Sequence, residues 1–370
     1  MKKHVAILFM SLITSFAFAQ KTNFNLLVGT YTAPGKSEGI YSYNFDTTNG
    51  ETVLKSLTKG PKNPSYLAIS PDGKYVYTVN ETGKGSTVSA YSYDAKTADL
   101  IFLNKVDSKG ADPCYITADA YNVIVANYSG GSLAVFKRKP DGSLTESIQV
   151  IQHIGKSIDP KGRQASAHVH MAKFTPDRKH MVVNDLGEDK IYVYNYNYNG
   201  GEKTLTEKQV VKMNVGTGPR HITFSPNGKF AYLVHEFNGL ISVFSYNNGT
   251  LTKIDEIGTA SKDFDGKIDA ADIHVSADGK FLYETNRGDA NTISVFSILA
   301  NGKLEPVETI SSMGKGPRNF TFDPSGKFLL VGHQYTNEIV IFKRNLTTGK
   351  LTDSGKRIEV GAPVCLVFDK

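Results

Sequence analysis

The sequence predicts an all-β protein: a seven-bladed β-propeller of four-stranded blades, with the ring closed by joining N- and C-terminal strands in one blade. A strand–turn–strand unit recurs along the chain with a period of roughly 50 residues, which is the length of a propeller blade. The 370-residue chain is rich in aromatic residues that favour strands, with 19 Tyr and 20 Phe. It contains no Trp, which excludes the tryptophan-based signatures of WD40 and kelch repeats.

The recurring unit is clearest in "GPRHITFSPNGKFAYLVHE" (218–236) and "GPRNFTFDPSGKFLLVGHQ" (316–334). A first strand such as "RHITFS" meets a turn, and a second strand such as "FAYLVHE" returns antiparallel to it. Within the turn, Pro fixes φ at the first corner and Gly takes the position that needs a positive φ. Further copies of the unit occupy 63–81, 112–128, 167–196 and 270–287.

The two ends of the chain are expected to build the seventh blade together. Residues 361–370 match only the first strand of the unit, whereas 23–58 carry the pattern of its second, third and fourth strands. We therefore expect the ends to pair and 20–370 to form a single propeller domain. A closed ring needs no second copy to complete it, so we expect a monomer.

The first 19 residues have the pattern of a secretory signal peptide. Two lysines precede an apolar run over 5–16, and small residues lie just before position 20. We expect cleavage after Ala19 and an exported protein, periplasmic or secreted. No later apolar stretch approaches membrane-spanning length, so no membrane partner is expected. The net charge of +6 is modest for this length and does not indicate a nucleic-acid partner.

Polar residues gather at one end of the repeated hairpin. Aligning the units on their turns places one residue of each first strand in the same register: Ser65, Cys114, His170, Arg220, Ala271, Arg318 and Val364. This register lies away from the turn, where Arg220 and His235 should face each other across the hairpin. First strands line the central channel of a propeller, so we expect these side chains to converge on one channel mouth as a binding site.

Several of these motifs resemble one known family. "HVHMAKFTPD" (168–177), "GPRHITFSPNGKFAYLVHE" and "ADIHVSADGKFLYETNRG" (271–288) are similar to the bacterial lactonase family, which includes propeller-type 6-phosphogluconolactonases and fungal carboxy-muconate lactonising enzymes. The likeness covers nearly all of 24–369. It implies a seven-bladed propeller that hydrolyses or forms a lactone, with no metal and no cofactor. The residues that it implicates in catalysis fall on His170, Arg220, Glu236 and Arg287.

Lactone hydrolysis requires an activated water, a stabilised oxyanion and a protonated leaving alkoxide. His170 is the best candidate for the general base, because an imidazole titrates near neutral pH. Glu236 is the alternative base or the general acid, or it simply forms a salt bridge with Arg220. The arginines can stabilise an oxyanion and bind a carboxylate or phosphate.

Further polar side chains of the same hairpin ends are candidates for binding an anionic lactone or sugar acid. Asp185 is expected to orient His170, and Arg318 to add a third cationic contact. The complete set of binding candidates is Asp185, His221, His235, Asn286, Arg318 and Gln334. His168 and His170 lie two apart on a strand, which would allow a metal pair, but no third ligand is evident.

A longer interval separates Cys114 from His170 and marks an insertion, 152–168. We expect this insertion either to fold over the channel mouth, with Lys156, Lys161 or Arg163 binding an anionic group, or to be an ordinary loop between blades. Cys114 and Cys365 are expected to be two buried thiols rather than a disulfide.

Two functions other than lactone hydrolysis fit the same pattern. One is a non-catalytic propeller that binds a ligand or a protein in the periplasm, which would need the arginines but not His170. The other is a lactonising enzyme or isomerase on the same scaffold. The export signal leaves the natural substrate open, because 6-phosphogluconolactone is an intermediate of cytoplasmic metabolism.

Overall fold

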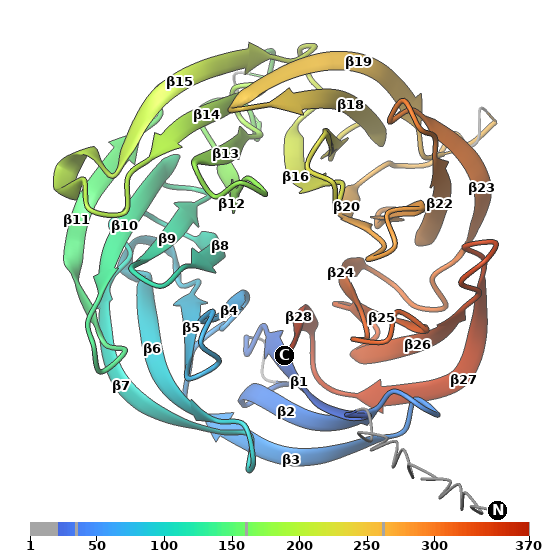
Figure 1. Cartoon of the computed structure of the whole chain (residues 1–370), viewed down its shortest axis with the longest axis horizontal. Coiled ribbons are helices and arrows are strands. Elements are labelled where there is room, and N and C mark those ends of the chain that lie inside the picture. Colours follow the sequence, from blue (N-terminus) through green and yellow to red (C-terminus); the bar gives the residue numbers. More distant parts are fainter. Residues whose placement is uncertain (1–20, 34–35, 160–161, 261–262, 370) are drawn as a thin grey trace, which may run out of the picture.

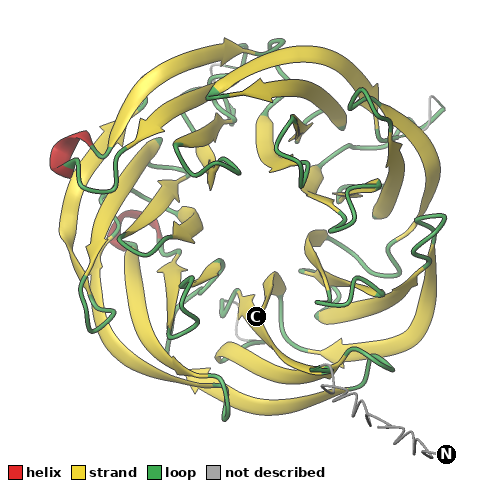
Figure 2. Ribbon diagram, viewed as in Figure 1, coloured by secondary structure: helices red, strands yellow, loops and turns green. Residues whose placement is uncertain are grey.

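The computed structural model describes residues 21–33, 36–159, 162–260 and 263–369, so the predicted signal peptide lies outside the described residues. Seven four-stranded antiparallel sheets are arranged in a ring around a central channel (Figure 1). Two short 3₁₀-helices, Gly83–Gly85 and Gly201–Lys203, are the only helices in the described part of the chain (Figure 2). Neither could span a membrane. The predicted seven-bladed β-propeller is confirmed.

The blades are numbered along the chain, each from its innermost strand outwards. Blade 1 contains β4 (Leu67–Ile69), β5 (Tyr75–Asn80), β6 (Thr87–Asp94) and β7 (Asp99–Asp107). Blade 2 contains β8 (Pro113–Ala118), β9 (Asn122–Asn127), β10 (Ser132–Arg138) and β11 (Leu144–Gln152). Blade 3 contains β12 (Val169–Phe174), β13 (His180–Asp185), β14 (Lys190–Tyr196) and β15 (Leu205–Lys212).

The remaining blades repeat this order. Blade 4 contains β16 (Pro219–Phe224), β17 (Phe230–His235), β18 (Leu240–Asn247) and β19 (Thr250–Gly258). Blade 5 contains β20 (Ala270–Val275), β21 (Phe281–Asn286), β22 (Thr292–Ile298) and β23 (Leu304–Ser311). Blade 6 contains β24 (Pro317–Phe322), β25 (Phe328–His333), β26 (Glu338–Arg344) and β27 (Leu351–Glu359). Blade 7 contains β28 (Pro363–Phe368), β1 (Asn23–Thr30), β2 (Gly39–Asp46) and β3 (Thr52–Lys59).

Blade 7 closes the ring in the predicted way. The C-terminal strand β28 pairs antiparallel with the N-terminal strand β1, with Leu26 opposite Phe368 and Gly29 opposite Cys365 (Figure 1). Gly29 is required here, because a Cβ atom at this position would lie 2.5 Å from the carbonyl oxygen of Pro64. Both cysteines are buried and free, as predicted.

The blades are held together by apolar packing and by a repeated tyrosine contact. Strand residues of neighbouring blades form shared clusters, such as the one that joins blades 2, 3 and 4. The buried hydroxyl of Tyr232 in blade 4 donates a hydrogen bond to the Gly302 carbonyl of blade 5, at 3.0 Å. Tyr77 makes the equivalent bond to Gly142 between blades 1 and 2, also at 3.0 Å. A buried Tyr hydroxyl needs such a partner, and these bonds join each blade to the next.

Candidate functional site

The predicted register residues meet in a narrow hollow of the central channel. Six of the seven line it, and only Ala271 does not. The full lining is Ser65, Tyr66, Cys114, His170, Arg220, His221, Arg318, Asn319 and Val364. The predicted convergence of these positions on the channel is therefore confirmed. We call this space the channel hollow.

A β-bulge brings these side chains into the hollow. In blade 4 the pairing of β16 with β17 shifts between Pro219 and His221, which leaves Arg220 as the extra residue. The same shift occurs in three other blades, at Cys114, His170 and Arg318. A bulge redirects a side chain that strict alternation would turn away. Two consecutive residues, Arg220 and His221, can therefore both line the hollow.

The bulge also corrects one expectation about register. Arg220 does not face His235, because the shift places Pro219 opposite His235. The His235 side chain instead bonds through Nε2 to the hydroxyl of Ser242 on β18, at 2.9 Å, and does not line the hollow. Burial lowers its pKa to about 4, so at neutral pH it is an uncharged part of blade 4.

Glu236 lies at the centre of an arginine cluster beside the hollow. Its Oε2 accepts a hydrogen bond from Arg220 Nε at 2.9 Å. Its Oε1 lies 2.5 Å from Arg163 Nη1 and 3.3 Å from Arg287 Nη2. Burial alone would raise the pKa of Glu236, but the three guanidinium groups, led by Arg287, outweigh burial and hold the pKa well below its ordinary range. Glu236 is therefore ionised at any physiological pH.

Arg220 is the most enclosed of these cations. Its side chain is buried, and its Nη1 donates to the carbonyl of Ala271 in blade 5. Burial and the nearby Arg287 lower the pKa of Arg220 to about 10, so it remains protonated at neutral pH. Arg287 is itself held by Asp269, whose Oδ1 lies 2.9 Å from Nη2. Contacts with residues of blade 5 and the loop before it therefore hold both Arg220 and Arg287 in place.

His170 lies between the arginine cluster and blade 2. Its Nε2 is 4.0 Å from Glu236 Oε2, and its Nδ1 is 3.8 Å from the thiol of Cys114. Burial lowers the pKa of His170 well below its ordinary value, and Arg220 adds to that effect. The imidazole is therefore neutral, which is the form that can accept a proton. His170, Arg220, Glu236 and Arg287, predicted as the catalytic group, are brought together at this mouth.

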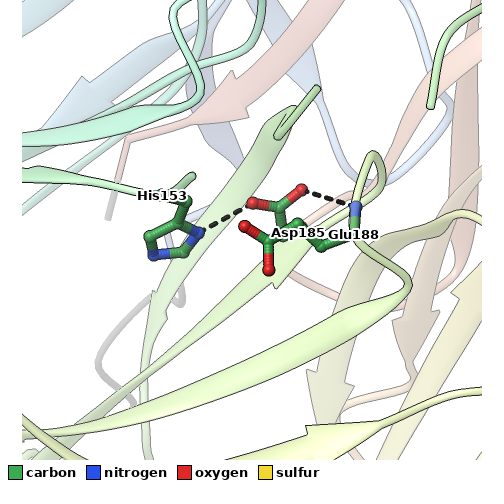
Figure 3. A group of neighbouring side chains, drawn as sticks. All are labelled: His153, Asp185 and Glu188. Atoms are coloured by element: carbon green, nitrogen blue, oxygen red, sulfur yellow. Dashed lines mark hydrogen bonds and ion pairs between the residues drawn. The ribbon is translucent and has the colours of Figure 1, made fainter. Parts of the chain in front are cut away.

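Asp185 does not have the predicted role of orienting His170. In the β12–β13 pair, Asp185 is opposite Val169, while His170 is the bulged residue turned towards the channel. Its Oδ2 lies 2.7 Å from His153 Nδ1 (Figure 3). Its Oδ1 accepts backbone hydrogen bonds from His168, Gly187 and Glu188. Asp185 therefore holds His153 and the backbone near His168 and Glu188 in place, and it does not contact the proposed base His170.

The cluster of His153, Asp185 and Glu188 brings potential metal-ligand atoms within 4.8 Å of one another (Figure 3). Those atoms already have protein partners. His153 Nε2 is 2.9 Å from the Tyr194 hydroxyl, and Glu188 Oε2 is 2.5 Å from the ammonium of Lys190. A cation at Glu188 makes the cluster a poor place for a metal. The cluster instead attaches the start of the insertion, at His153, to blade 3.

Two other predicted binding residues lie outside the lining of the hollow. Asn286 accepts a hydrogen bond from the backbone of Asp269 at 3.1 Å, and Gln334 follows β25 with its side-chain oxygen buried. His168 Nδ1 bonds to the Ser166 carbonyl at 2.8 Å, and neither His168 nor His170 belongs to the group of three potential metal ligands found among the described residues. His221 and Arg318, by contrast, both line the hollow as predicted.

The insertion reaches the channel mouth through Arg163. Of the two alternatives considered for this segment, the contact agrees with the one in which it folds towards the mouth. Besides its contact with Glu236, Arg163 Nε donates to the Tyr128 hydroxyl at 2.8 Å, and the guanidinium lies over the Phe237 ring at 5.0 Å. The neighbouring Gln164 is fixed by a hydrogen bond to Asp189 Oδ2 at 2.8 Å. Lys161, a further candidate of this segment, lies outside the described residues.

A second carboxylate, which the repeat places at the same hairpin end but which was not among the predicted site residues, lies on another side of the hollow. Glu81 Oε2 accepts hydrogen bonds from Ser65 Oγ at 2.6 Å and from the Tyr31 hydroxyl at 2.9 Å. The Tyr31 hydroxyl also accepts a bond from Arg318 at 3.2 Å. The repeat places Glu81 at this hairpin end, because Glu81 follows β5 as Glu236 follows β17.

Beside the hollow lies a His–Asp–His arrangement that the sequence did not indicate, in which His221 and Asp272 are buried and His274 is partly exposed. His221 Nδ1 is 2.8 Å from Asp272 Oδ1, and His274 Nε2 is 3.0 Å from Asp272 Oδ2. The rings of His221 and His170 lie edge to face with centroids 5.2 Å apart. Two imidazoles and the guanidinium groups of Arg220 and Arg318 thus surround one small space.

Comparison with known proteins places this geometry in a family. The family model "Lactonase, 7-bladed beta-propeller" matches residues 25–368. The chain is 36% identical over 346 residues to the 6-phosphogluconolactonase of Bacillus subtilis, which covers 92% of this chain and 97% of that protein. It is also 36% identical over 336 residues to the 6-phosphogluconolactonase of Formosa agariphila, covering 88% of this chain and 94% of that protein.

A solved structure agrees with these relatives over the whole propeller. The periplasmic gluconolactonase of Pseudomonas aeruginosa superposes with a TM-score of 0.89 at 36% identity, covering 94% of this chain and 99% of that chain. The match with the family model extends over all seven blades, including the blade that closes the ring. The resemblance inferred from the sequence motifs is confirmed, and the chain belongs to the lactonase family of seven-bladed β-propellers.

Proposed function

We propose that this protein is a lactone hydrolase of the 6-phosphogluconolactonase type, which opens an anionic sugar-acid lactone at the mouth of the channel hollow. The observation that carries the proposal is the convergence of one neutral imidazole, His170, with the guanidinium groups of Arg220 and Arg318 in an enclosed space. A base and fixed cations are what ester hydrolysis without a covalent intermediate requires. The names of the Bacillus and Pseudomonas relatives support the same reaction class.

The proposed reaction proceeds by direct attack of water. As the water oxygen bonds to the lactone carbonyl carbon, His170 accepts one of its protons, and Glu236, 4.0 Å away, stabilises the imidazolium that forms. Arg220 and Arg318 stabilise the negative oxygen of the tetrahedral intermediate. The ring C–O bond then breaks, and His170 returns its proton to the departing alkoxide. The products are an open-chain acid and a regenerated neutral imidazole.

The charge of the mouth supports an anionic substrate. Four arginines, at 163, 220, 287 and 318, surround the two carboxylates Glu81 and Glu236. Asp269 also pairs with Arg287, so the support for an anionic ligand is the presence of several guanidinium groups, each able to bind a phosphate or carboxylate through two hydrogen bonds. Glu236 has no proton to donate because its pKa is so low, so we assign it to positioning Arg220 and Arg287. The signal-like pattern of 1–19 and the periplasmic relative support an exported enzyme.

The test is hydrolysis of freshly made 6-phosphogluconolactone and of unphosphorylated gluconolactone by residues 20–370, with the uncatalysed rate subtracted. We expect turnover of at least one substrate, and the ratio between them shows whether a phosphate is recognised. His170→Gln should reduce kcat by about 10²- to 10⁴-fold, the usual contribution of a general base. His180→Gln is the matched control, because His180 lies at the other end of blade 3, bonded to Tyr246.

Two results would contradict the proposal. One is the absence of turnover above background on both lactones, which would favour a propeller that only binds its ligand. The other is a His170→Gln variant as active as the His180→Gln control.

A further inference from the structure

Asp272 has a complete set of hydrogen-bond donors around it. Its Oδ1 accepts from His221 Nδ1 at 2.8 Å and from the backbone N–H of Ile273 at 3.0 Å. Its Oδ2 accepts from His274 Nε2 at 3.0 Å, from Asn319 Nδ2 at 2.5 Å and from the backbone N–H of Phe320 at 3.2 Å. With five donors and no acceptor beside its oxygens, the carboxylate carries no proton.

The state of Asp272 determines the tautomer of His221. Burial alone would raise the pKa of Asp272, but His274 and His221 outweigh it and hold the pKa well below its ordinary value. An ionised carboxylate can only accept, so His221 Nδ1 must carry the hydrogen. Burial and Arg220 lower the pKa of His221 to about 4, so the ring is neutral at pH 7. Nε2 is therefore a bare acceptor.

That acceptor is unused within the protein. His221 Nε2 is buried and has no hydrogen-bond partner among the described residues, although His221 lines the hollow. A buried acceptor without a partner is destabilising, because it has lost its hydrogen bond to water, so native proteins rarely retain one without a reason. The side chains that face His221 are Tyr66, Tyr115, His170 and Arg220. None of them donates to Nε2.

The size of the hollow limits the kind of group that can bind to His221 Nε2. The volume in which the centre of a water-sized sphere fits is about 10 Å³, which is about the minimum for holding a single water molecule. A sugar lactone requires a far larger pocket, of at least ~300 Å³ for most small ligands. The lactone ring must therefore lie at the mouth, near Arg287 and Arg163, while the hollow beneath it admits one small polar group.

We propose that the channel hollow holds the hydrolytic water, and that His221, with its bare Nε2 kept available by Asp272, is a further catalytic residue that accepts a hydrogen bond from that water. This rests on the proposed hydrolase function. A water has two O–H groups, so one bonds to His221 Nε2 while the other delivers its proton to His170. His221 takes no proton in the net reaction. The O–H bonded to it becomes the hydroxyl of the new acid group, which ionises when the product leaves.

Asp272 is then a positioning residue, and Asp272→Asn tests the arrangement. An Asn side chain can turn its N–H towards His221 Nδ1, which moves the ring hydrogen to Nε2 and removes the acceptor. We expect kcat to fall by about 10²- to 10⁴-fold with KM changed less than threefold, as for other catalytic imidazoles with a reversed tautomer. His221→Phe should cause a comparable loss. Asp369→Asn is the matched control, because Asp369 is a buried carboxylate that bonds to Asn25 of blade 7 and to Tyr93 of blade 1.

Two measurements need no turnover. Nitrogen-15 NMR of the histidine side chains should show hydrogen on Nδ1 of His221 in the wild type and on Nε2 in Asp272→Asn. A high-resolution crystal structure should show a water within about 3 Å of His221 Nε2. Hydrogen on Nε2 in the wild type, an empty hollow, or an unchanged kcat in Asp272→Asn with the reversed tautomer would overturn the inference. A wild type without lactonase activity would instead overturn the proposed function, since the NMR and the water position are independent of it.

Discussion

Glu236 and Glu81 occupy the same position of the repeated unit in two different blades, yet their environments are opposite. Each follows the last residue of a second strand, His235 of β17 or Asn80 of β5. Each donates its backbone N–H to the loop before its blade, Glu236 to Gly218 at 2.8 Å and Glu81 to Asn63 at 3.1 Å. The backbone of the two sites is therefore equivalent.

The side chains differ because the register position of the same unit holds Arg220 beside Glu236 but Ser65 beside Glu81, and because their other partners come from different segments. Glu236 meets three guanidinium groups, from the insertion, from blade 4 and from blade 5, and its pKa is held low. Glu81 meets the hydroxyls of Ser65 and Tyr31, and burial raises its pKa above the ordinary value despite Arg318. The comparison shows that the repeat fixes where a carboxylate is placed, while the residue at the register position and the contacts from other segments decide its charge state.

The largest expected effect is on the Glu236 side. Arg220→Ala should lower kcat by about 10²- to 10³-fold, because it removes a buried cation from the hollow where the oxyanion forms. The equivalent change on the Glu81 side, Arg318→Ala, should have a smaller effect, since Arg318 also bonds to Tyr31. Steady-state kinetics of both variants, with the exposed Arg178→Ala as a control, measure the difference. A greater loss in Arg318→Ala would reverse the assignment of the reactive side.

The next largest effect is on stability. Glu236→Gln removes the counter-charge of the buried Arg220 and one of the two carboxylates beside Arg287, and it should destabilise the fold by about 3–5 kcal/mol, as expected when one partner of a buried ion pair is removed. Glu81→Gln keeps an acceptor for Ser65 and Tyr31, so its effect should be below about 1 kcal/mol. Urea unfolding at pH 7 gives both values. Equal destabilisation by the two variants would contradict the claim that Glu236 balances buried guanidinium groups while Glu81 mainly accepts hydrogen bonds from hydroxyls.

The two carboxylates should also have opposite pH dependence. The folded-state pKa of Glu236 is lowered, so its stabilisation is present above the unfolded value of 4.5 and is lost as the pH falls below it. The folded-state pKa of Glu81 is raised, so its contribution is greatest at low pH and declines as the pH rises above 4.5. Relative to the wild type, Glu236→Gln should therefore be least destabilised near pH 3. Between pH 4 and pH 7, Glu81→Gln should become more stable relative to the wild type. The prediction is contradicted if the difference in unfolding free energy from the wild type changes with pH in the same way for both variants.

The smallest expected effect is at the rim. The Arg163 side chain is 49% exposed, and its loss leaves Arg220 and Arg287 on Glu236. Arg163→Ala should raise KM for 6-phosphogluconolactone by about three- to tenfold and leave kcat nearly unchanged, as for a rim charge that assists binding. The effect should weaken at high salt, because an exposed charge is screened. A fall in kcat with unchanged KM would place Arg163 in the reaction instead of at the entrance.

The sequence was sufficient for the features that repeat. The turn chemistry of units such as "SPNG" defined the register, and the register correctly placed Arg220, His170 and Arg318 around one hollow. The partial first strand at the C-terminus correctly predicted the closing blade. These inferences depend on a local sequence pattern that recurs several times along the chain.

The features that were missed depend on contacts between distant segments. Asp185 was expected beside His170, but His153 of the insertion takes its carboxylate, and no local pattern shows where an insertion folds. His235 was misplaced because the bulge at Arg220 shifts the hairpin register, and a single extra residue leaves no clear mark in the sequence. The pairing of His221 with Asp272 joins blades 4 and 5, so neither residue indicates the other in the sequence.

The most direct test of the central claim is a double-mutant comparison of lactone hydrolysis. Ring opening of 6-phosphogluconolactone, followed by acid release in a pH-stat, is measured for the wild type, His170→Gln, Arg220→Ala and the double variant. If both residues act on the same reacting group in the hollow, each single change should abolish most of the catalysis, and the double variant should be little worse than the more damaged single variant. Full activity in both single variants, with all proteins folded, would contradict lactone hydrolysis at this channel mouth.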